Sequence, residues 1–148
     1  MRLTIGDIWE YHSNGAYVVI PTNTEFYETS KGPRAIMGGG LALDAAERFP
    51  EVVYRYGEHL RSGKTRLVAS DLRLILLPTK EHWRNPSIPS LIDNGCRMLA
   101  KWAGSHPGFE IAVPALGCGL GALDWVVVQE IMERHLIADC FVVVLREN

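Results

Sequence analysis

The sequence lacks the features that mark secreted, membrane-bound or metal-binding proteins. Its three cysteines, Cys96, Cys118 and Cys140, lie far apart and form no Cys-x-x-Cys pair, so neither a disulfide framework nor a zinc site is predicted. The five histidines have no His-x-x-x-His spacing, and we expect no metal and no cofactor. No apolar run approaches the roughly 18 residues of a membrane helix, and the first residues show no secretory-signal pattern. We therefore expect a cytoplasmic protein without a membrane partner.

An excess of charge of one sign is also missing. The chain has 15 Lys and Arg against 17 Asp and Glu, for a formal net charge of -2, which argues against nonspecific coating of nucleic acid. Between positions 55 and 84, however, seven basic residues stand against three acidic ones. Such a stretch is typical of a solvated face and is also compatible with a local basic patch.

The chain does have enough apolar content for one core. At 148 residues and 47% apolar content, it is expected to bury about 70% of the surface that its unfolded form exposes. No repeat, low-complexity segment or linker divides it. We predict a single domain over residues 1–148.

Short apolar runs alternate with stretches that are rich in helix formers or have apolar spacings of three and four. The runs are typical of strands buried in a sheet, and the spacings are typical of amphipathic helices. The predicted strands are Arg2–Ile5, Tyr17–Pro21, Arg66–Ala69, Leu72–Leu77, Glu110–Val113 and Cys140–Leu145. The predicted helices are Leu41–Phe49, Glu51–Leu60, Ser87–Trp102 (stopped by Gly104) and Asp124–Leu136 (with Asp124 as its N-cap). This alternation predicts an α/β fold, a three-layer α/β/α sandwich around a mixed, mostly parallel six-stranded sheet.

Two glycine-rich loops interrupt the pattern. Residues 22–40 are polar and rich in turn formers, a predicted loop of about nineteen residues that ends in Gly38-Gly39-Gly40. Loops beyond roughly 15 residues are uncommon and usually functional or mobile. Residues 114–123 form the second loop, which contains Gly117-Cys118-Gly119-Leu120-Gly121.

Both loops are expected to follow a strand and to lead into a helix. Free backbone N–H groups and a partial positive charge at a helix N-terminus favour phosphate, and glycine lets a ligand approach the backbone closely. Ligands of such folds bind at the carboxyl ends of the strands. The two loops are therefore expected to face each other and clamp a diphosphate. The alternative is that both loops are ordinary tight turns without a ligand.

Five motifs occur in a fixed order along the chain. They are Gly6-Asp7-Ile8, Asn23-Thr24, Met37 to Leu43 with Phe49-Pro50 after it, Pro78 to Arg84, and Pro114 to Trp125. Together they resemble the motifs of macrodomains, the ADP-ribose-binding modules, over nearly the whole chain. The likeness is to the branch that contains DarG antitoxins and the vertebrate terminal ADP-ribose glycohydrolase, which remove ADP-ribose from DNA bases or from carboxylate side chains.

The resemblance implies a set of site residues. Asp7 is implied to accept a hydrogen bond from the adenine amino group, Asn23 to contact the distal ribose, and Lys80 to be the catalytic lysine. The glycine loops are implied to hold the diphosphate and the distal ribose. The other residues implied to line ADP-ribose are Ile8, Thr24, Met37, Gly38, Gly39, Gly40, Leu41, Thr79, Leu116, Gly117, Cys118, Gly119, Leu120 and Gly121.

The chain departs from the family pattern at three places. The first Asn of the Asn-x-x-Asn pattern of many relatives falls near Ile20, and the insertion from Glu25 to Arg34 lengthens the loop before the glycines. The catalytic Asp of the vertebrate enzyme corresponds to Gly121 here, as in DarG. The resemblance is therefore nearer to the DNA-directed group, and a mechanism that needs both the lysine and that carboxylate is not expected.

Lys80 and Asn23 are the candidate catalytic residues. A lysine that attacks the anomeric carbon must first lose its proton, and a neighbouring diphosphate dianion opposes that loss. We hypothesise that Lys80 stays charged and stabilises the charge that develops on the leaving group, while Asn23 orients the ribose or a water. Asp7 and Asn23 each have a local alternative, because either side chain could stabilise a turn after its strand. A solvated surface lysine is the alternative for Lys80.

Trp83 and Arg84 follow Lys80 and are candidate nucleic-acid contacts. An aromatic ring and a guanidinium could stack on a nucleobase and bind its phosphate, whereas a Trp83 packed on the core would only anchor the loop. Trp9, Trp102 and Trp125 are expected to be structural.

The expected function is an antitoxin-like ADP-ribosyl glycohydrolase that acts on ADP-ribosylated DNA. Its ligand would be ADP-ribose or an ADP-ribosylated macromolecule, with single-stranded DNA as a further partner. Two alternatives stay open, a module that binds ADP-ribose without turnover and a phosphatase that acts on ADP-ribose 1''-phosphate.

Overall fold

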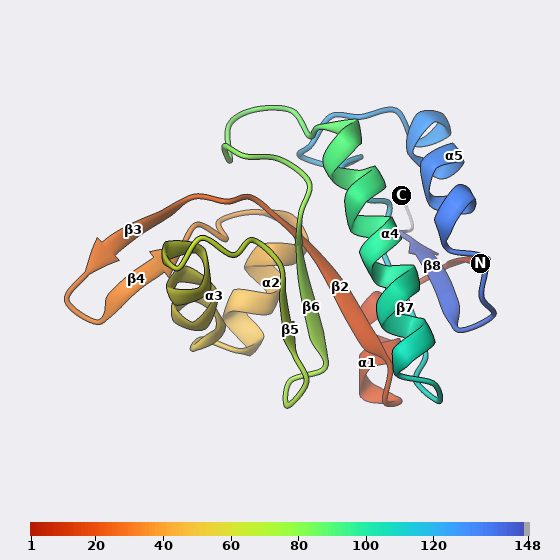
Figure 1. Cartoon of the computed structure of the whole chain (residues 1–148), viewed down its shortest axis with the longest axis horizontal. Coiled ribbons are helices and arrows are strands. Elements are labelled where there is room, and N and C mark those ends of the chain that lie inside the picture. The colour runs from red at the N-terminus through yellow and green to blue at the C-terminus, as the bar shows by residue number, and fades with distance from the viewer. Residues whose placement is uncertain (147–148) are drawn as a thin grey trace.

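The computed structural model describes residues 1–146 and has a six-stranded sheet between two layers of helices (Figure 1). The strand order is β1-β8-β7-β2-β6-β5, and every neighbouring pair is parallel except β5 with β6. The strands are β1 (Arg2–Ile5), β2 (Tyr17–Thr22), β5 (Leu67–Ala69), β6 (Leu74–Pro78), β7 (Ile111–Val113) and β8 (Phe141–Leu145). The predicted fold class is confirmed.

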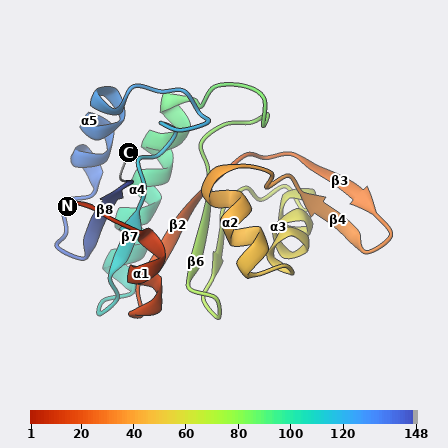
Figure 2. The same cartoon turned by 180° about the vertical axis from the view of Figure 1, so that it is seen from behind.

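Each face of the sheet carries its own apolar core. Helices α1 (Ile8–Ser13), α2 (Gly40–Arg48) and α3 (Val52–Arg61) cover one face, and α4 (Pro89–Ser105) and α5 (Trp125–His135) cover the other (Figures 1 and 2). Along β2, Val18 and Ile20 belong to the first core and Val19 to the second. Strands buried on both faces need apolar residues at every position, which explains the continuous runs in the sequence.

The predicted loop over residues 22–40 is wrong in part. The second strand continues past Pro21 to Thr22, and a hairpin of β3 (Phe26–Thr29) and β4 (Gly32–Ala35) follows. Its strands have four residues each and are mostly polar, so they carry no periodic apolar signal. The inserted segment is therefore ordered by its contact with α3, which its own sequence does not reveal.

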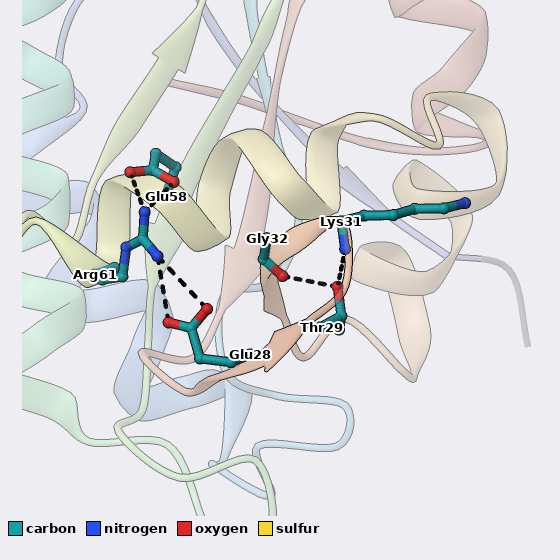
Figure 3. A network of polar contacts seen from close by, with 6 residues as sticks. All are labelled: Glu28, Thr29, Lys31, Gly32, Glu58 and Arg61. Atoms are coloured by element: carbon teal, nitrogen blue, oxygen red, sulfur yellow. Dashed lines mark hydrogen bonds and ion pairs between the residues drawn. The ribbon is translucent and has the colours of Figure 1, made fainter.

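The backbone of helix α3 lies directly against the backbone of the hairpin. A Cβ added to Gly57 would lie 2.2 Å from the carbonyl oxygen of Pro33, so only glycine allows this packing. Figure 3 shows the polar contacts that fix the hairpin: the Arg61 guanidinium lies 3.4 Å from the Glu28 carboxylate and 2.8 Å from that of Glu58. Within the turn, the Thr29 hydroxyl donates to the Gly32 carbonyl over 2.8 Å.

Helix α1 was not predicted, because six residues are too few for a recognisable helical pattern. Asp7 caps it by accepting a hydrogen bond of 3.0 Å from the Trp9 N–H. The strand expected from Leu72 begins at Leu74, since the preceding residues form a turn in which Arg73 has a φ of 52°. Helix α4 runs one residue beyond Gly104, and Asp124 caps α5 as predicted.

Trp9 is buried in the first core, and Trp102 and Trp125 pack against the second. Across residues 1–146, no helix has the length and apolar content needed to cross a bilayer.

Candidate ligand-binding site

The predicted site residues gather at one edge of the sheet. Strand β2 pairs in parallel with β6 on one side and with β7 on the other, so the segments that leave their carboxyl ends are neighbours. Asn23 follows β2 directly, and Lys80 lies two residues beyond β6. The Thr79 N–H donates a hydrogen bond of 3.0 Å to the Thr22 carbonyl, which joins the two segments.

The two glycine loops touch. A Cβ added to Gly39 would lie 2.5 Å from Cδ1 of Leu120, and one added to Gly40 would lie 3.8 Å from the same atom. Leu120 is otherwise 72% exposed. The two loops therefore lie next to each other, and the Leu120 side chain of the second loop reaches the backbone of the first.

The first loop ends in an open helix N-terminus. Gly39 is the N-cap of α2 and has no side-chain capping bond, and Gly40 has a φ of 56°. The first N–H groups of a helix have no partner within the helix, so those of Gly40 and Leu41 are available to an anion. The preceding strand, β4, belongs to the hairpin rather than to the main sheet, which corrects the predicted strand-to-helix junction.

The second loop is folded into tight turns. The Cys118 N–H donates to the Ala115 carbonyl and the Leu123 N–H to the Gly117 carbonyl, over 3.2 and 2.9 Å. Within residues 1–146, the N–H groups of Gly119, Leu120 and Gly121 have no backbone acceptor. They are the donors that this loop offers a ligand.

Cys118, in the same loop, is half-buried. Its thiol contacts the Leu116 carbonyl at 3.5 Å, and burial raises its pKa. A raised pKa lowers the thiolate fraction, so Cys118 fills the turn and is not an activated nucleophile.

Ser87 connects the Lys80 segment to the second glycine loop, and no pattern in the sequence indicated this role. Its N–H donates to the Gly121 carbonyl over 2.8 Å, and its hydroxyl shares a hydrogen bond of 3.0 Å with that of Thr79. A Cβ added to Gly121 would lie 2.2 Å from Ser87 Oγ and 2.5 Å from the Gly117 carbonyl oxygen. The structure therefore has no room for a carboxylate at position 121.

The Asn23 carboxamide is engaged within the protein. Asn23 is 7% exposed; its Nδ2 donates to the Ile36 carbonyl and its Oδ1 accepts from the Glu25 N–H, both over 2.9 Å. The local turn that was the alternative for Asn23 is thus present. One Nδ2 hydrogen and one Oδ1 lone pair remain for a ligand.

Tyr56 is a second residue that the sequence did not reveal. Its fully buried hydroxyl accepts from the Thr22 hydroxyl over 2.8 Å and donates to the Thr65 carbonyl over 2.7 Å. Burial raises the pKa of this hydroxyl, so it stays a neutral donor. It holds the end of β2 immediately before Asn23.

Lys80 is half-buried, and no ion pair holds it among residues 1–146. The segment after it is fastened to the exit of β2, because the Thr24 N–H and hydroxyl both donate to the Glu81 carbonyl over 3.1 Å. The Lys80 ammonium is therefore free to meet a ligand at the edge of the sheet.

The tip of this segment is exposed. Trp83 is 47% exposed and does not pack on either core, which argues against the loop-anchor alternative. The Arg84 guanidinium lies 4.7 Å from its ring centroid, in cation–π contact. His82 contacts the Glu25 carboxylate, which raises the pKa of the imidazole.

The separation of Asp7 and Lys80 along this edge indicates how long a ligand must be to contact both residues. Asp7 follows β1 and Lys80 follows β6, four strand positions away in the sheet. At a strand spacing of about 4.8 Å, the two lie about 19 Å apart. A ligand that reaches from the exposed Asp7 carboxylate to Lys80 is extended, with its middle at the two glycine loops.

Known proteins resemble this chain in sequence and in structure, although no family model matches it. It is 33% identical over 126 residues to a DNA ADP-ribosyl transferase-DNA ADP-ribosyl glycohydrolase fusion protein of Thermosipho africanus, an alignment that covers 68% of this chain and 32% of that protein. The macrodomain of Thermus aquaticus DarG has a TM-score of 0.78 at 25% identity, covering 99% of this chain and 97% of that one. Thermosipho africanus DarTG in complex with ADP-ribose has a TM-score of 0.77 at 27% identity, covering 99% of this chain and 42% of that one. The chain spans about a third of the length of the curated relatives it matches.

Proposed function

Because this chain is a DarG-like macrodomain, we propose that it binds ADP-ribose along the carboxyl edge of its sheet and hydrolyses the bond between ADP-ribose and a DNA base. One observation carries the proposal: a free lysine ammonium stands on a segment that is hydrogen-bonded to the second of two touching glycine loops. The loops supply donors for a diphosphate, and the lysine supplies a charge beside it. The names of the similar proteins support the same reaction.

The bound nucleotide runs from Asp7 to Lys80. Asp7 uses one carboxylate oxygen to cap α1, and the other accepts the adenine amino group beside Ile8. The open N-terminus of α2, with Gly38, Gly39, Gly40 and Leu41, and the free N–H groups of the second loop hold the diphosphate. Leu120 moves aside to admit it. The distal ribose lies beside Asn23, Thr24 and Thr79, with Met37 and Leu116 beneath the loops.

The reaction breaks the bond between the anomeric carbon and the base and forms a bond from that carbon to a water oxygen. One proton of the water passes to the departing base. Lys80 stays an ammonium and stabilises the negative charge that the base gains as the bond breaks. Asn23, held by its two loop bonds, offers its remaining hydrogen and lone pair to the ribose or to the water.

Trp83 and Arg84 contact the nucleic acid that carries the modified base. Single-strand binders combine aromatic faces with cationic side chains, because every base has a face to stack and every link has a phosphate. The exposed ring and the adjacent guanidinium have this composition.

The test compares substrates and variants side by side. Wild type is incubated with ADP-ribosylated single-stranded DNA, an ADP-ribosylated protein and ADP-ribose 1''-phosphate, and free ADP-ribose is titrated by calorimetry. Lys80→Ala is expected to lower release of ADP-ribose from DNA at least 100-fold while the affinity for free ADP-ribose persists. Lys101→Ala, an exposed lysine in the second half of α4, is the matched control and is expected to be silent.

The outcomes separate the candidate functions. Binding without turnover of any substrate by wild type identifies a binding module, and release of phosphate alone identifies a phosphatase. A covalent ADP-ribose adduct on Lys80 after borohydride treatment would overturn the assigned role of the ammonium. No heat on titration with ADP-ribose contradicts the proposal as a whole.

A further inference from the structure

A polar hollow is lined largely by the segment that follows Lys80 in the chain. It has a volume of about 290 Å³ and is lined by Glu25, His82, Trp83, Arg84 and Asn85. We propose that this hollow is the acceptor subsite, that it takes a nucleobase rather than an acidic amino-acid side chain, and that Glu25 and Trp83 determine this choice. The inference rests on the proposed function and identifies the class of acceptor.

Backbone hydrogen bonds hold both walls of the hollow in place. On one wall, the Glu25 N–H donates to Asn23 Oδ1 over 2.9 Å and the Glu25 carbonyl accepts from the Ile36 N–H over 3.2 Å. On the other wall, the Asn85 N–H donates to the His82 carbonyl over 3.1 Å and closes a turn. Both of these bonds are made by the Glu25 backbone. Its carboxylate contacts the His82 imidazole through Oε1, and Oε2 remains to accept a hydrogen bond from a ligand.

The lining offers hydrogen-bond acceptors, hydrogen-bond donors and an aromatic face, which are contacts that a nucleobase can use. Glu25 is an acceptor, the His82 ring and Arg84 are donors, and the Asn85 carboxamide is both. The exposed ring of Trp83 provides a flat face, and base–aromatic stacking is sequence-tolerant. A carboxylate side chain can accept from an exocyclic amino group of a base, as Glu does from cytosine.

An acidic amino-acid acceptor would use only part of this lining. His82 and Arg84 would attract a carboxylate as well as a phosphate, so the two cations do not distinguish the acceptors. An acidic side chain has no flat face for Trp83 and no N–H group for Glu25. Glu25 and Trp83 therefore carry the preference.

The experiment measures acceptor choice in variants of these two residues. Hydrolysis of an ADP-ribosylated single-stranded oligonucleotide and of a peptide ADP-ribosylated on glutamate is followed for wild type, Glu25→Ala, Glu25→Gln and Trp83→Ala. A base contact is worth about 1–3 kcal/mol. We expect Glu25→Ala and Trp83→Ala each to raise KM for the oligonucleotide about tenfold, with a smaller rise for Glu25→Gln, which keeps one acceptor oxygen.

KM for the peptide and the affinity for free ADP-ribose are expected to stay unchanged in all three variants. Glu28→Ala is the matched control, because Glu28 is an acidic residue three positions along whose carboxylate contacts Arg61 instead. Unchanged oligonucleotide KM in both alanine variants overturns the inference. An equal loss on oligonucleotide and peptide overturns it as well, since it would mean a structural effect on Lys80.

Binding tests the hollow even without turnover. In a Lys80→Ala background, the modified oligonucleotide is expected to bind about tenfold more tightly than free ADP-ribose, and Trp83→Ala is expected to remove that gain. Equal affinity for the two ligands contradicts the subsite but leaves the ADP-ribose site intact. Failure of wild type to bind free ADP-ribose contradicts the proposed function instead.

Discussion

The segment between β6 and α4 has a base and a tip that differ in almost every physical respect. At the base, Thr79 and Ser87 are buried and hydrogen-bonded to each other, to the end of β2 and to the second glycine loop. At the tip, Trp83 and Arg84 are exposed and contact each other. The base thus fixes where Lys80 stands relative to a bound nucleotide, and the tip is left for whatever the nucleotide is attached to.

The largest expected effect comes from a side chain placed against the base. Gly121→Asp puts a Cβ 2.5 Å from the Gly117 carbonyl oxygen and 2.2 Å from Ser87 Oγ. Overpacking of this kind costs about 1–3 kcal/mol, and we expect the second glycine loop to shift, with loss of ADP-ribose binding and of hydrolysis.

Thermal unfolding and calorimetry measure the two consequences of Gly121→Asp. Gly119→Ala serves as the control for folding, because a Cβ there has nothing within 4 Å. A stable, active Gly121→Asp protein would show that the base tolerates a carboxylate at this position.

Removing the hydroxyl of Ser87 is expected to loosen the base without blocking it. Ser87→Ala leaves the Thr79 hydroxyl without its partner in a buried position, at a cost of about 1–3 kcal/mol in the free energy of unfolding. The bond from the Ser87 N–H to Gly121 remains, so kcat for hydrolysis is expected to fall more than the affinity for ADP-ribose.

Urea unfolding and steady-state kinetics test this expectation. Ser105→Ala, which removes an exposed hydroxyl at the end of α4, is the control and should change neither quantity. Equal losses of kcat and affinity would mean that Ser87 supports the fold but does not position Lys80.

Tyr56→Phe is expected to have a comparable or smaller effect, exerted from the other side of β2. The lost hydroxyl leaves the Thr22 hydroxyl and the Thr65 carbonyl unsatisfied, which costs about 1–3 kcal/mol. In a double-mutant cycle with Thr22→Val, the combined loss should be smaller than the sum of the single losses. Additive losses would contradict the hydrogen bond as the link between α3 and the site.

The smallest effect is expected at the tip, from pH. The hydrogen bond to Glu25, followed by electrostatic attraction to that carboxylate, raises the pKa of His82. A raised pKa in the folded protein means that the contact stabilises the tip fully below the ordinary histidine pKa of about 6.5 and loses this contribution as pH rises through the raised value.

An NMR titration of the His82 imidazole measures this shift directly. The pKa is expected to be above the ordinary value in wild type and to fall in Glu25→Ala, whereas Glu28→Ala should leave it unchanged. A wild-type His82 that titrates at the ordinary value would show that the Glu25 carboxylate does not contact the imidazole in solution.

The sequence alone was sufficient for the strands of the main sheet and for the second glycine loop, and only in part for the first, which contains the hairpin of β3 and β4. Runs such as Leu74–Pro78 and Phe141–Leu145 are apolar at nearly every position. A strand that is covered by helices on both faces of its sheet requires this pattern, so the pattern identifies the strand. The caps of two helices follow from local chemistry as well, since Asp7 and Asp124 each accept a bond from a backbone N–H two residues on. The hairpin over residues 26–35 was missed because its order comes from α3, which lies outside its own sequence.

The sequence by itself determined the alternation of strands and helices and the order of the ligand motifs, because each depends only on residues that are close together in the chain. Only the tertiary structure decided which of these residues meet. Ser87 and Gly121, Gly39 and Leu120, and Glu25 and His82 are distant along the chain, and no local pattern records their contact. The parallel pairing of β2 with β6 and β7 brings their carboxyl ends to one edge, and the site exists because of that pairing.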